Sequence, residues 1–165
     1  MLKLNIANLV DGQFQHEVTV QPGDLNLDNT DEFKSPIDVA FDVEKIGRNI
    51  FINLTLETKI SLFCDRCAEE FVYALAEKLR LIYIYDHQFV EKEEDDVFVV
   101  EKSTSIIDVK EPIRQTCIVS VPYKKLCNPD CKGLCPSCGA NLNRATCGCK
   151  VENIDPRWEK LKRLL

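Results

Sequence analysis

The stretch Ile50-Phe51-Ile52-Asn53-Leu54-Thr55-Leu56-Glu57-Thr58-Lys59-Ile60-Ser61-Leu62 decides the fold of this chain. Apolar residues recur in it at every second position, and this period of two predicts a strand with one buried face. The first four residues on that face are Ile50, Ile52, Leu54 and Leu56. Because the run is long for one strand, we expect a bend or bulge near 57–59.

The run leads directly into Cys64-Asp65-Arg66-Cys67, and a second long segment, 71–85, follows. That segment places its later apolar residues on one face: Leu79, Leu81, Tyr83 and Tyr85. Two long strands separated by a short polar stretch predict a hairpin with the Cys-x-x-Cys motif at its tip. Within the second segment, 74–79 could instead form a helical turn, and the pattern alone leaves both options open.

Shorter alternating segments surround this hairpin at 2–6, 16–20, 37–45 and 97–100. Gly47-Arg48-Asn49 is typical of a hairpin connection between two strands. Together the segments predict a strongly twisted antiparallel sheet or a partly open barrel.

One helix is expected at about 108–121. Asp108-Val109-Lys110-Glu111 resembles a capping box with Asp in the place of Ser or Thr. Every fourth residue of the segment is then apolar and would form one buried stripe: Val109, Ile113, Cys117 and Val121. Pro122 would end the helix.

These elements predict an α+β chain in three parts. Residues 1–122 form a β-rich body that contains the helix and an acidic, solvated loop at 91–96. Residues 123–150 form a cysteine-rich zinc-knuckle segment. Residues 151–165 form a short terminal helix that begins at Asp155-Pro156, where proline suits the first helical position.

The cysteine-rich segment holds six of the nine cysteines of the chain, between Cys127 and Cys149. Its Cys135-Pro136-Ser137-Cys138-Gly139 stretch is typical of a zinc knuckle, which presents two thiolates to one ion with little strain. The N-terminus carries no apolar signal core with a cleavage site. Clustered cysteines in a reducing compartment indicate metal ligands rather than disulfides.

Spacing narrows the choice of ligands for one or two Zn²⁺ ions. We predict one site from Cys135, Cys138, Cys147 and Cys149. A second site would then combine the remaining cluster members with the hairpin motif: Cys127, Cys131, Cys64 and Cys67. A compact alternative uses Cys127, Cys131, Cys135 and Cys138. Four thiolates leave no open position for substrate, so either arrangement predicts a structural metal.

The charge of the chain is distributed unevenly. Residues 1–116 carry net −11 and residues 117–165 carry net +5. A basic tail on an acidic body indicates that the two ends meet different partners, although the tail could also fold back onto the body. The candidate contacts to RNA or another partner are Lys124, Lys125, Lys132, Arg144, Lys150, Arg157, Lys160, Lys162 and Arg163.

The sequence contains few features that would indicate an enzyme. Cys64 and Cys67 lack the βαβ context of a thioredoxin-type redox pair. The two histidines, His16 and His87, have no recognisable Ser or Asp partner in the sequence, and the six glycines do not form a phosphate-binding loop. No apolar run approaches the length that spans a bilayer. We therefore expect a cytoplasmic, non-catalytic protein with no membrane partner and no small-molecule substrate.

Several motifs also recur together in a known family. They are Cys64-Asp65-Arg66-Cys67, the acidic run 91–96, the helix ending at Pro122, Cys127-x-x-x-Cys131-Lys132-Gly133-Leu134-Cys135-Pro136-x-Cys138-Gly139-x-Asn141-Leu142-Asn143, Cys147-x-Cys149 and Asp155-Pro156-Arg157-Trp158. In this combination the chain resembles the YceD family of large ribosomal RNA subunit accumulation proteins. The resemblance implies a role in producing or stabilising 23S rRNA without a known catalytic activity.

The partner implied by this resemblance is ribosomal RNA or a large-subunit ribosomal protein. RNA-binding proteins are usually basic, because phosphate contacts dominate their affinity. The acidic body could instead bind a basic ribosomal protein, and the effect on rRNA would then be indirect. Two further hypotheses are a thiol redox or zinc-sensing protein that uses Cys64 and Cys67, and a zinc ribbon that contacts DNA or polymerase.

Overall fold

The structure is a computed structural model that describes residues 2–7, 9–28, 31–85, 97–101 and 103–149. The expected acidic loop at 91–96 and the expected terminal helix at 151–165 lie outside these ranges. The chain divides into two compact units. The sheet unit comprises Met1–Leu62 and Phe71–Tyr123, and the cysteine unit comprises Phe63–Glu70 and Lys124–Leu165.

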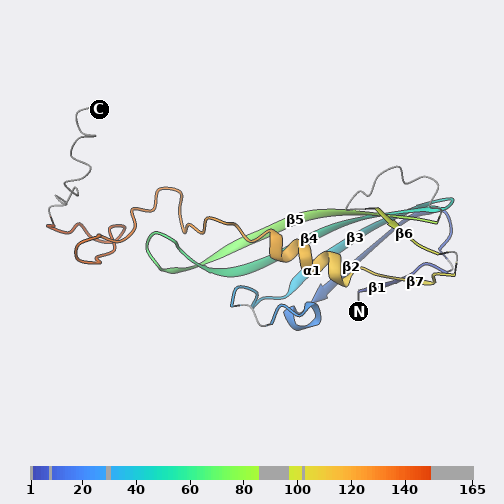
Figure 1. Cartoon of the computed structure of the whole chain (residues 1–165), viewed down its shortest axis with the longest axis horizontal. Coiled ribbons are helices and arrows are strands. Elements are labelled where there is room, and N and C mark those ends of the chain that lie inside the picture. Colours follow the sequence, from blue (N-terminus) through green and yellow to red (C-terminus); the bar gives the residue numbers. More distant parts are fainter. Residues whose placement is uncertain (1, 8, 29–30, 86–96, 102, 150–165) are drawn as a thin grey trace, which may run out of the picture. The chain divides into compact units, whose positions relative to one another are not determined.

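A five-stranded sheet forms the larger part of the sheet unit, with strand order β2-β3-β4-β5-β6 (Figure 1). Its strands are β2 (Gly12–Val20), β3 (Ile37–Ile46), β4 (Asn49–Phe63), β5 (Glu70–Ile84) and β6 (Val97–Val99). In the described part of the chain, β2 and β6 end this order without pairing with each other. The sheet is therefore open, and of the two predicted arrangements the partly open barrel is wrong.

The hairpin between β3 and β4 forms where the sequence predicts it. Ile46 pairs with Asn49, so that Gly47 and Arg48 make a two-residue turn. Gly47 has a φ of +57°. Tight hairpin turns require such positive φ values, which glycine adopts without steric cost.

β4 alternates without interruption from Ile50 to Leu62, and the residues of its buried face are Ile50, Ile52, Leu54, Leu56, Thr58, Ile60 and Leu62. The polar member, Thr58, donates a hydrogen bond from its hydroxyl to the carbonyl of Pro36 at 2.8 Å. An inserted residue would shift the buried set by one position. The expected bulge near 57–59 is therefore wrong.

β5 is a strand throughout, so the helical option at 74–79 is also wrong. β6 pairs with β5 in parallel, with Ile82 opposite Val97. The sheet is thus mixed rather than purely antiparallel. Alternation identifies both segments as strands but carries no information about their relative direction.

A second, two-stranded sheet joins β1 (Lys3–Asn5) to β7 (Ile106–Asp108) in antiparallel pairing. β7 was not predicted from the sequence, because its two apolar residues, Ile106 and Ile107, are adjacent and show no alternation. The core also includes Leu25, at the end of the short 3₁₀ helix η1 (Pro22–Leu25), and Leu27 and Phe33, which follow it in the sequence. These residues follow no regular spacing and were missed for that reason.

α1 (Lys110–Val119) is the predicted helix, somewhat shorter than expected. Val109, Ile113 and Cys117 are fully buried in the core and Val121 is partly buried, which confirms the predicted stripe. The predicted capping box is wrong, since Val109 is the N-cap and makes no side-chain capping bond. Asp108 instead accepts a hydrogen bond from the N–H of Lys110 at 2.9 Å. Among the described residues, no helix has the length and apolar character needed to cross a membrane.

Candidate metal centres

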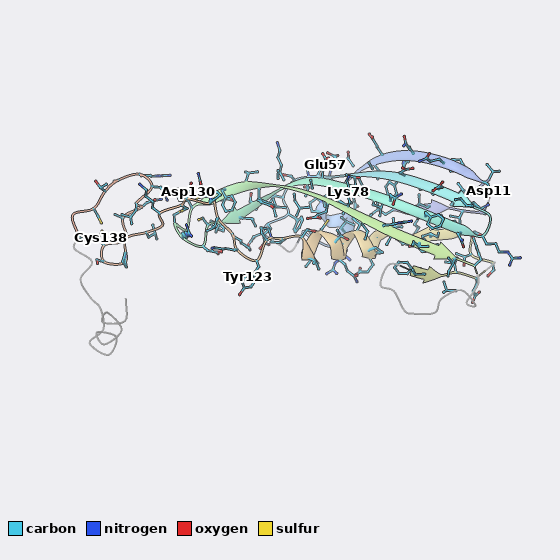
Figure 2. The ribbon with its side chains drawn as sticks, turned by 90° about the horizontal axis from the view of Figure 1, so that it is seen from above. Asp11, Glu57, Lys78, Tyr123, Asp130 and Cys138 are labelled. Atoms are coloured by element: carbon cyan, nitrogen blue, oxygen red, sulfur yellow. The ribbon has the colours of Figure 1, made fainter. Side chains whose placement is uncertain are left out.

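Apart from the ends of β4 and β5 and one isolated bridge between Leu134 and Asn141, the described part of the cysteine unit consists of loops and turns, as Figure 2 shows around Asp130 and Cys138. Its first segment is the turn between β4 and β5. The N–H of Cys64 donates to the carbonyl of Glu69 at 2.9 Å, and the N–H of Ala68 donates to the carbonyl of Cys64 at 2.8 Å. Ala68 takes a left-handed φ of +56° to close this turn. The turn thereby presents the two thiols of its Cys-x-x-Cys motif together.

The second segment of the unit runs alongside this turn. The N–H of Asp65 donates to the carbonyl of Lys125 at 2.8 Å, and the N–H of Lys125 donates back to the Asp65 carboxylate at 2.7 Å. The guanidinium of Arg66 donates to the carbonyls of Pro129, at 3.2 Å, and Cys131, at 2.7 Å. These bonds hold residues 125–131 in register with the turn, so that cysteines some sixty positions apart converge.

The first site is the group of four sulfurs that results: Cys64, Cys67, Cys127 and Cys131, all within 4.8 Å of one another. Two of the sulfur pairs measure 3.8 Å (Cys64 to Cys131) and 3.7 Å (Cys67 to Cys127). Zinc with four tetrahedral sulfur bonds of about 2.3 Å places its sulfurs about 3.8 Å apart. A disulfide would bring two sulfurs to about 2.05 Å, and all the described cysteines are free. The geometry therefore fits a tetrahedral thiolate site.

The second site gathers Cys135, Cys138, Cys147 and Cys149, whose sulfurs also lie within 4.8 Å of one another. Its knuckle is closed by hydrogen bonds from the N–H of Gly139 to the carbonyl of Cys135 at 2.9 Å and from the N–H of Cys135 to the carbonyl of Ala140 at 2.8 Å. Gly139 has a φ of +73°. The compact alternative set of Cys127, Cys131, Cys135 and Cys138 is not brought together.

Local hydrogen bonds prepare one thiol in each site for ionisation. The backbone N–H of Cys127 beside Cys64 lowers the pKa of that thiol to about 6. The N–H groups of Cys138 and Ser137 lower the pKa of Cys135 to about 6 as well. Hydrogen bonds to sulfur favour the thiolate, which is the form that binds metal.

Other thiols in the two sites have raised pKa values. Burial, followed by the nearby thiols of Cys64 and Cys131, raises the pKa of Cys127 to about 12. The thiol and charge of Cys138 raise the pKa of Cys149 to about 12. Four negative sulfurs this close repel one another, so each site needs a cation before all four can ionise.

Cys117, the ninth cysteine, belongs to neither group. It lies in the core of the sheet unit, where burial raises its pKa to about 11. The sequence assigned it to the core on the basis of its place in the helical stripe, and the structure confirms this position.

Only some of the predicted basic contact residues lie within the described part of the chain. Lys124, Lys132 and Arg144 are exposed and Lys125 is partly buried. Arg144 forms an ion pair with Glu69 at 2.6 Å. The remaining candidates lie outside the described residues: Lys150, Arg157, Lys160, Lys162 and Arg163. Arg66 was not among the predicted contacts, and its guanidinium donates to the backbone carbonyls of Pro129 and Cys131.

Comparison with known proteins identifies relatives. The family model described as "Large ribosomal RNA subunit accumulation protein YceD" matches residues 52–165, which is more than half of the chain. An uncharacterised protein of Mycobacterium tuberculosis (strain ATCC 25618 / H37Rv) is 31% identical over 131 residues, which cover 78% of this chain and 62% of the relative. The Zea mays protein named "Large ribosomal RNA subunit accumulation protein YCED homolog 1, chloroplastic" is 27% identical over 149 residues, covering 73% of this chain and 51% of the relative.

An Arabidopsis thaliana protein of the same name is 26% identical over 156 residues, which cover 79% of this chain and 49% of the relative. The chain thus spans between about half and three fifths of the length of these relatives. No solved structure matches it.

Proposed function

Because the chain belongs to the YceD family of large ribosomal RNA subunit accumulation proteins, we propose that it is a non-catalytic factor in large ribosomal subunit biogenesis. It promotes accumulation of 23S rRNA by binding that RNA or a large-subunit ribosomal protein. The observation that carries the proposal is the extent of the family match, because residues 52–165 include every cysteine of both four-sulfur sites. The function named for the family and the two sites therefore belong to one stretch of chain.

Both sites, on this proposal, hold structural Zn²⁺. The first site binds through Cys64, Cys67, Cys127 and Cys131, and the second through Cys135, Cys138, Cys147 and Cys149. An ion held by four thiolates is coordinatively saturated and supplies shape rather than catalysis. A cytoplasm that keeps thiols reduced suits such sites.

The proposed partner binds to the surface of the cysteine unit, which the two ions hold in its folded shape. The proposed contacts begin with Lys124 and Lys132, which are exposed in the cysteine unit. Lys125, Arg144 and the basic residues between 150 and 163 extend this set to nine cations, which outnumber the four acidic residues of 117–165 and leave that segment with a net charge of +5. The body, with net −11 over residues 1–116, is the proposed contact for a basic ribosomal protein.

The test combines a metal assay with crosslinking of the native chain in cells. We expect two zinc ions per chain and crosslinks to 23S rRNA or a large-subunit ribosomal protein. Depletion of the protein should lower the amount of 23S rRNA relative to the small-subunit rRNA. Crosslinks only to duplex DNA, or none to any ribosomal component, would contradict the proposal.

A pair of variants separates the two kinds of contact. Lys124→Glu combined with Lys132→Glu reverses two exposed charges of the cysteine unit, whereas Lys59→Glu combined with Lys78→Glu reverses two exposed charges of the sheet unit. Direct RNA binding predicts that the first pair weakens RNA crosslinking several-fold and that the second pair leaves it unchanged. If a basic ribosomal protein is the partner, neither pair lowers RNA crosslinking, and the protein crosslink persists.

The lowered pKa of Cys64, about 6, supports a second candidate function in thiol redox or zinc sensing. This candidate requires that Cys64 and Cys67 cycle between dithiol and disulfide in the native protein. Thiol labelling of cells before and after oxidant treatment distinguishes the two functions. A structural zinc site predicts that both thiols stay protected and reduced.

A further inference from the structure

Asn143 belongs to the loop of one site but contacts the other. In sequence it lies between Cys138 and Cys147, two members of the second site. Its side-chain nitrogen nevertheless donates a hydrogen bond to the sulfur of Cys131, a member of the first site, at 3.3 Å. The bond joins positions twelve residues apart.

The orientation of the Asn143 amide follows from its other bonds. Its side-chain oxygen accepts the backbone N–H of Lys132 at 2.8 Å. Its nitrogen therefore faces Cys131, and the same nitrogen also donates to the side-chain oxygen of Asn141 at 2.9 Å. The backbone N–H of Asn143 reaches that oxygen at 2.9 Å as well. Asn141 thus holds Asn143 in place from within the loop of the second site.

A backbone path joins the same two regions. The N–H of Leu142 donates to the carbonyl of Gly133 at 2.9 Å, and the N–H of Leu134 donates to the carbonyl of Arg66 at 3.1 Å. The loop of the second site is thereby attached to the turn that carries Cys64 and Cys67. An ordered second site therefore places Asn143 against the first.

We propose that Asn143 is a positioning residue that couples the two sites, so that an ion in the second site strengthens binding of an ion in the first. The inference rests on the proposed metal binding. The amide N–H stabilises negative charge on the Cys131 sulfur, which four thiolates around one divalent ion leave in excess. It can do so only while the loop that holds Asn143 is folded, and the second ion folds that loop. By linkage, the first ion strengthens binding at the second site by the same factor.

The contact is tested by cobalt titration of the full chain, because Co²⁺ bound by thiolates gives a sulfur-to-metal charge-transfer band. The test variant Asn143→Asp keeps the oxygen that accepts from Lys132 but replaces the N–H donor by a carboxylate oxygen. We expect first-site affinity to fall by about 10- to 100-fold, the range typical of lost outer-shell contacts to metal ligands. The band of that site should shift to longer wavelength, because a thiolate without its donor is easier to oxidise.

The matched control is Asn128→Asp, which adds the same charge beside Cys127. Asn128 accepts the N–H of Asp130 through its side-chain oxygen at 2.9 Å, a bond that aspartate retains. This variant should bind Co²⁺ within about threefold of the unaltered chain, with no change in the band. Equal losses in the two aspartate variants, or no loss in either, would overturn the role of Asn143.

The coupling itself is tested by disabling the second site with Cys147→Ser and Cys149→Ser together. First-site affinity should fall at least about tenfold in the otherwise unaltered chain, and less than about threefold when Asn143→Asp is already present. Cys117→Ser, which removes a thiol outside both sites, should have no effect on affinity. Two ions that bind independently would overturn the coupling while leaving the proposed function intact. A chain that binds no ion would overturn the metal-binding part of the proposed function.

Discussion

The sheet unit and the cysteine unit are stabilised by different chemistry. Among the described residues of the sheet unit, 23 buried residues form one cluster, and nearly all of them have hydrocarbon side chains. In the described part of the cysteine unit, the buried side chains are four cysteines: Cys64, Cys67, Cys131 and Cys135. The first unit can fold by removing apolar surface from water. The described part of the second buries no large hydrocarbon side chain, so we expect it to depend on its cysteine sulfurs and its backbone hydrogen bonds.

The same contrast predicts which unit needs a bound metal in order to stay folded. A segment too short to bury a core usually needs a metal or a disulfide to be stable. The cysteine unit has sulfurs at tetrahedral spacing and free cysteines throughout its described residues. We therefore expect the cysteine unit, unlike the sheet unit, to require a bound ion for its stability.

The largest expected effect comes from removing metal with a strong chelator. The cysteine unit should lose its structure, because binding energies of structural zinc, on the order of 10 kcal/mol, are also folding energies. The sheet unit should keep its strand content by circular dichroism. Limited trypsin digestion provides the measurement, with cleavage at Lys124, Lys132 and Arg144 expected to accelerate only in the chelated chain. Restoring zinc should restore protection, and unchanged cleavage rates would remove the contrast between the units.

The converse experiment weakens the sheet unit alone. Ile52 is fully buried on β4, and Ile52→Ala should lower the free energy of unfolding of the sheet unit by about 2–5 kcal/mol. Zinc stoichiometry should remain at two ions per chain. Urea unfolding followed by circular dichroism measures the first quantity, and a metal assay measures the second. As a control, Thr55→Ala on the opposite face of β4 should cost less than about 1 kcal/mol.

A set of glycine variants tests the backbone of the cysteine unit. Gly133 has a φ of +76°, and a Cβ at this position would lie 2.9 Å from the carbonyl oxygen of Arg66. Gly139 has a φ of +73° but no atom within 4 Å of such a Cβ, whereas Gly148 has neither constraint. Gly139→Ala should cost about 1–2 kcal/mol for its left-handed backbone, Gly133→Ala should cost more because of the clash, and Gly148→Ala should cost the least. Metal affinity measured by chelator competition should follow this order, and equal losses at all three would show that the clash has no effect.

Sequence reasoning succeeded where a period carried the information. Ile52 and Leu54 belong to an alternating run, and Ile113 and Cys117 belong to a stripe that recurs every four residues, so both patterns identified buried faces correctly. Leu25 is equally buried but lies in an irregular segment without a repeat. The direction of β6 and the pairing of β1 with β7 depend on contacts between distant segments, which no local pattern encodes.

The candidate sites divide in the same way. Spacing alone grouped Cys135 with Cys138, because a knuckle is a local structure. Cys127 and Cys131 were joined to the hairpin motif by counting the thiols that remained, and the structure brings the same four together. The contacts of Arg66 and Asn143 with the Cys131 region could not be predicted, since they join segments that only the folded loops bring together.

The smallest effect concerns the one cysteine of the sheet unit. Burial raises the pKa of Cys117 to about 11 from an ordinary thiol value of 9.0. The pKa of Cys64, in the cysteine unit, is instead lowered to about 6. Between pH 9 and 11 the unfolded chain therefore releases the Cys117 proton while the folded chain retains it, so the stability of the sheet unit falls as pH rises.

Cys117→Ala removes this contribution, and the variant should lose less stability than the unaltered chain over that interval. The measurement is the urea midpoint of the sheet unit at pH 8 and pH 11 in the two chains. Tyr83, whose pKa burial raises to about 12, acts in the same direction but is present in both chains and cancels in the difference. If the two chains lost stability equally between these pH values, Cys117 would not be a buried thiol that stays protonated in the folded sheet unit.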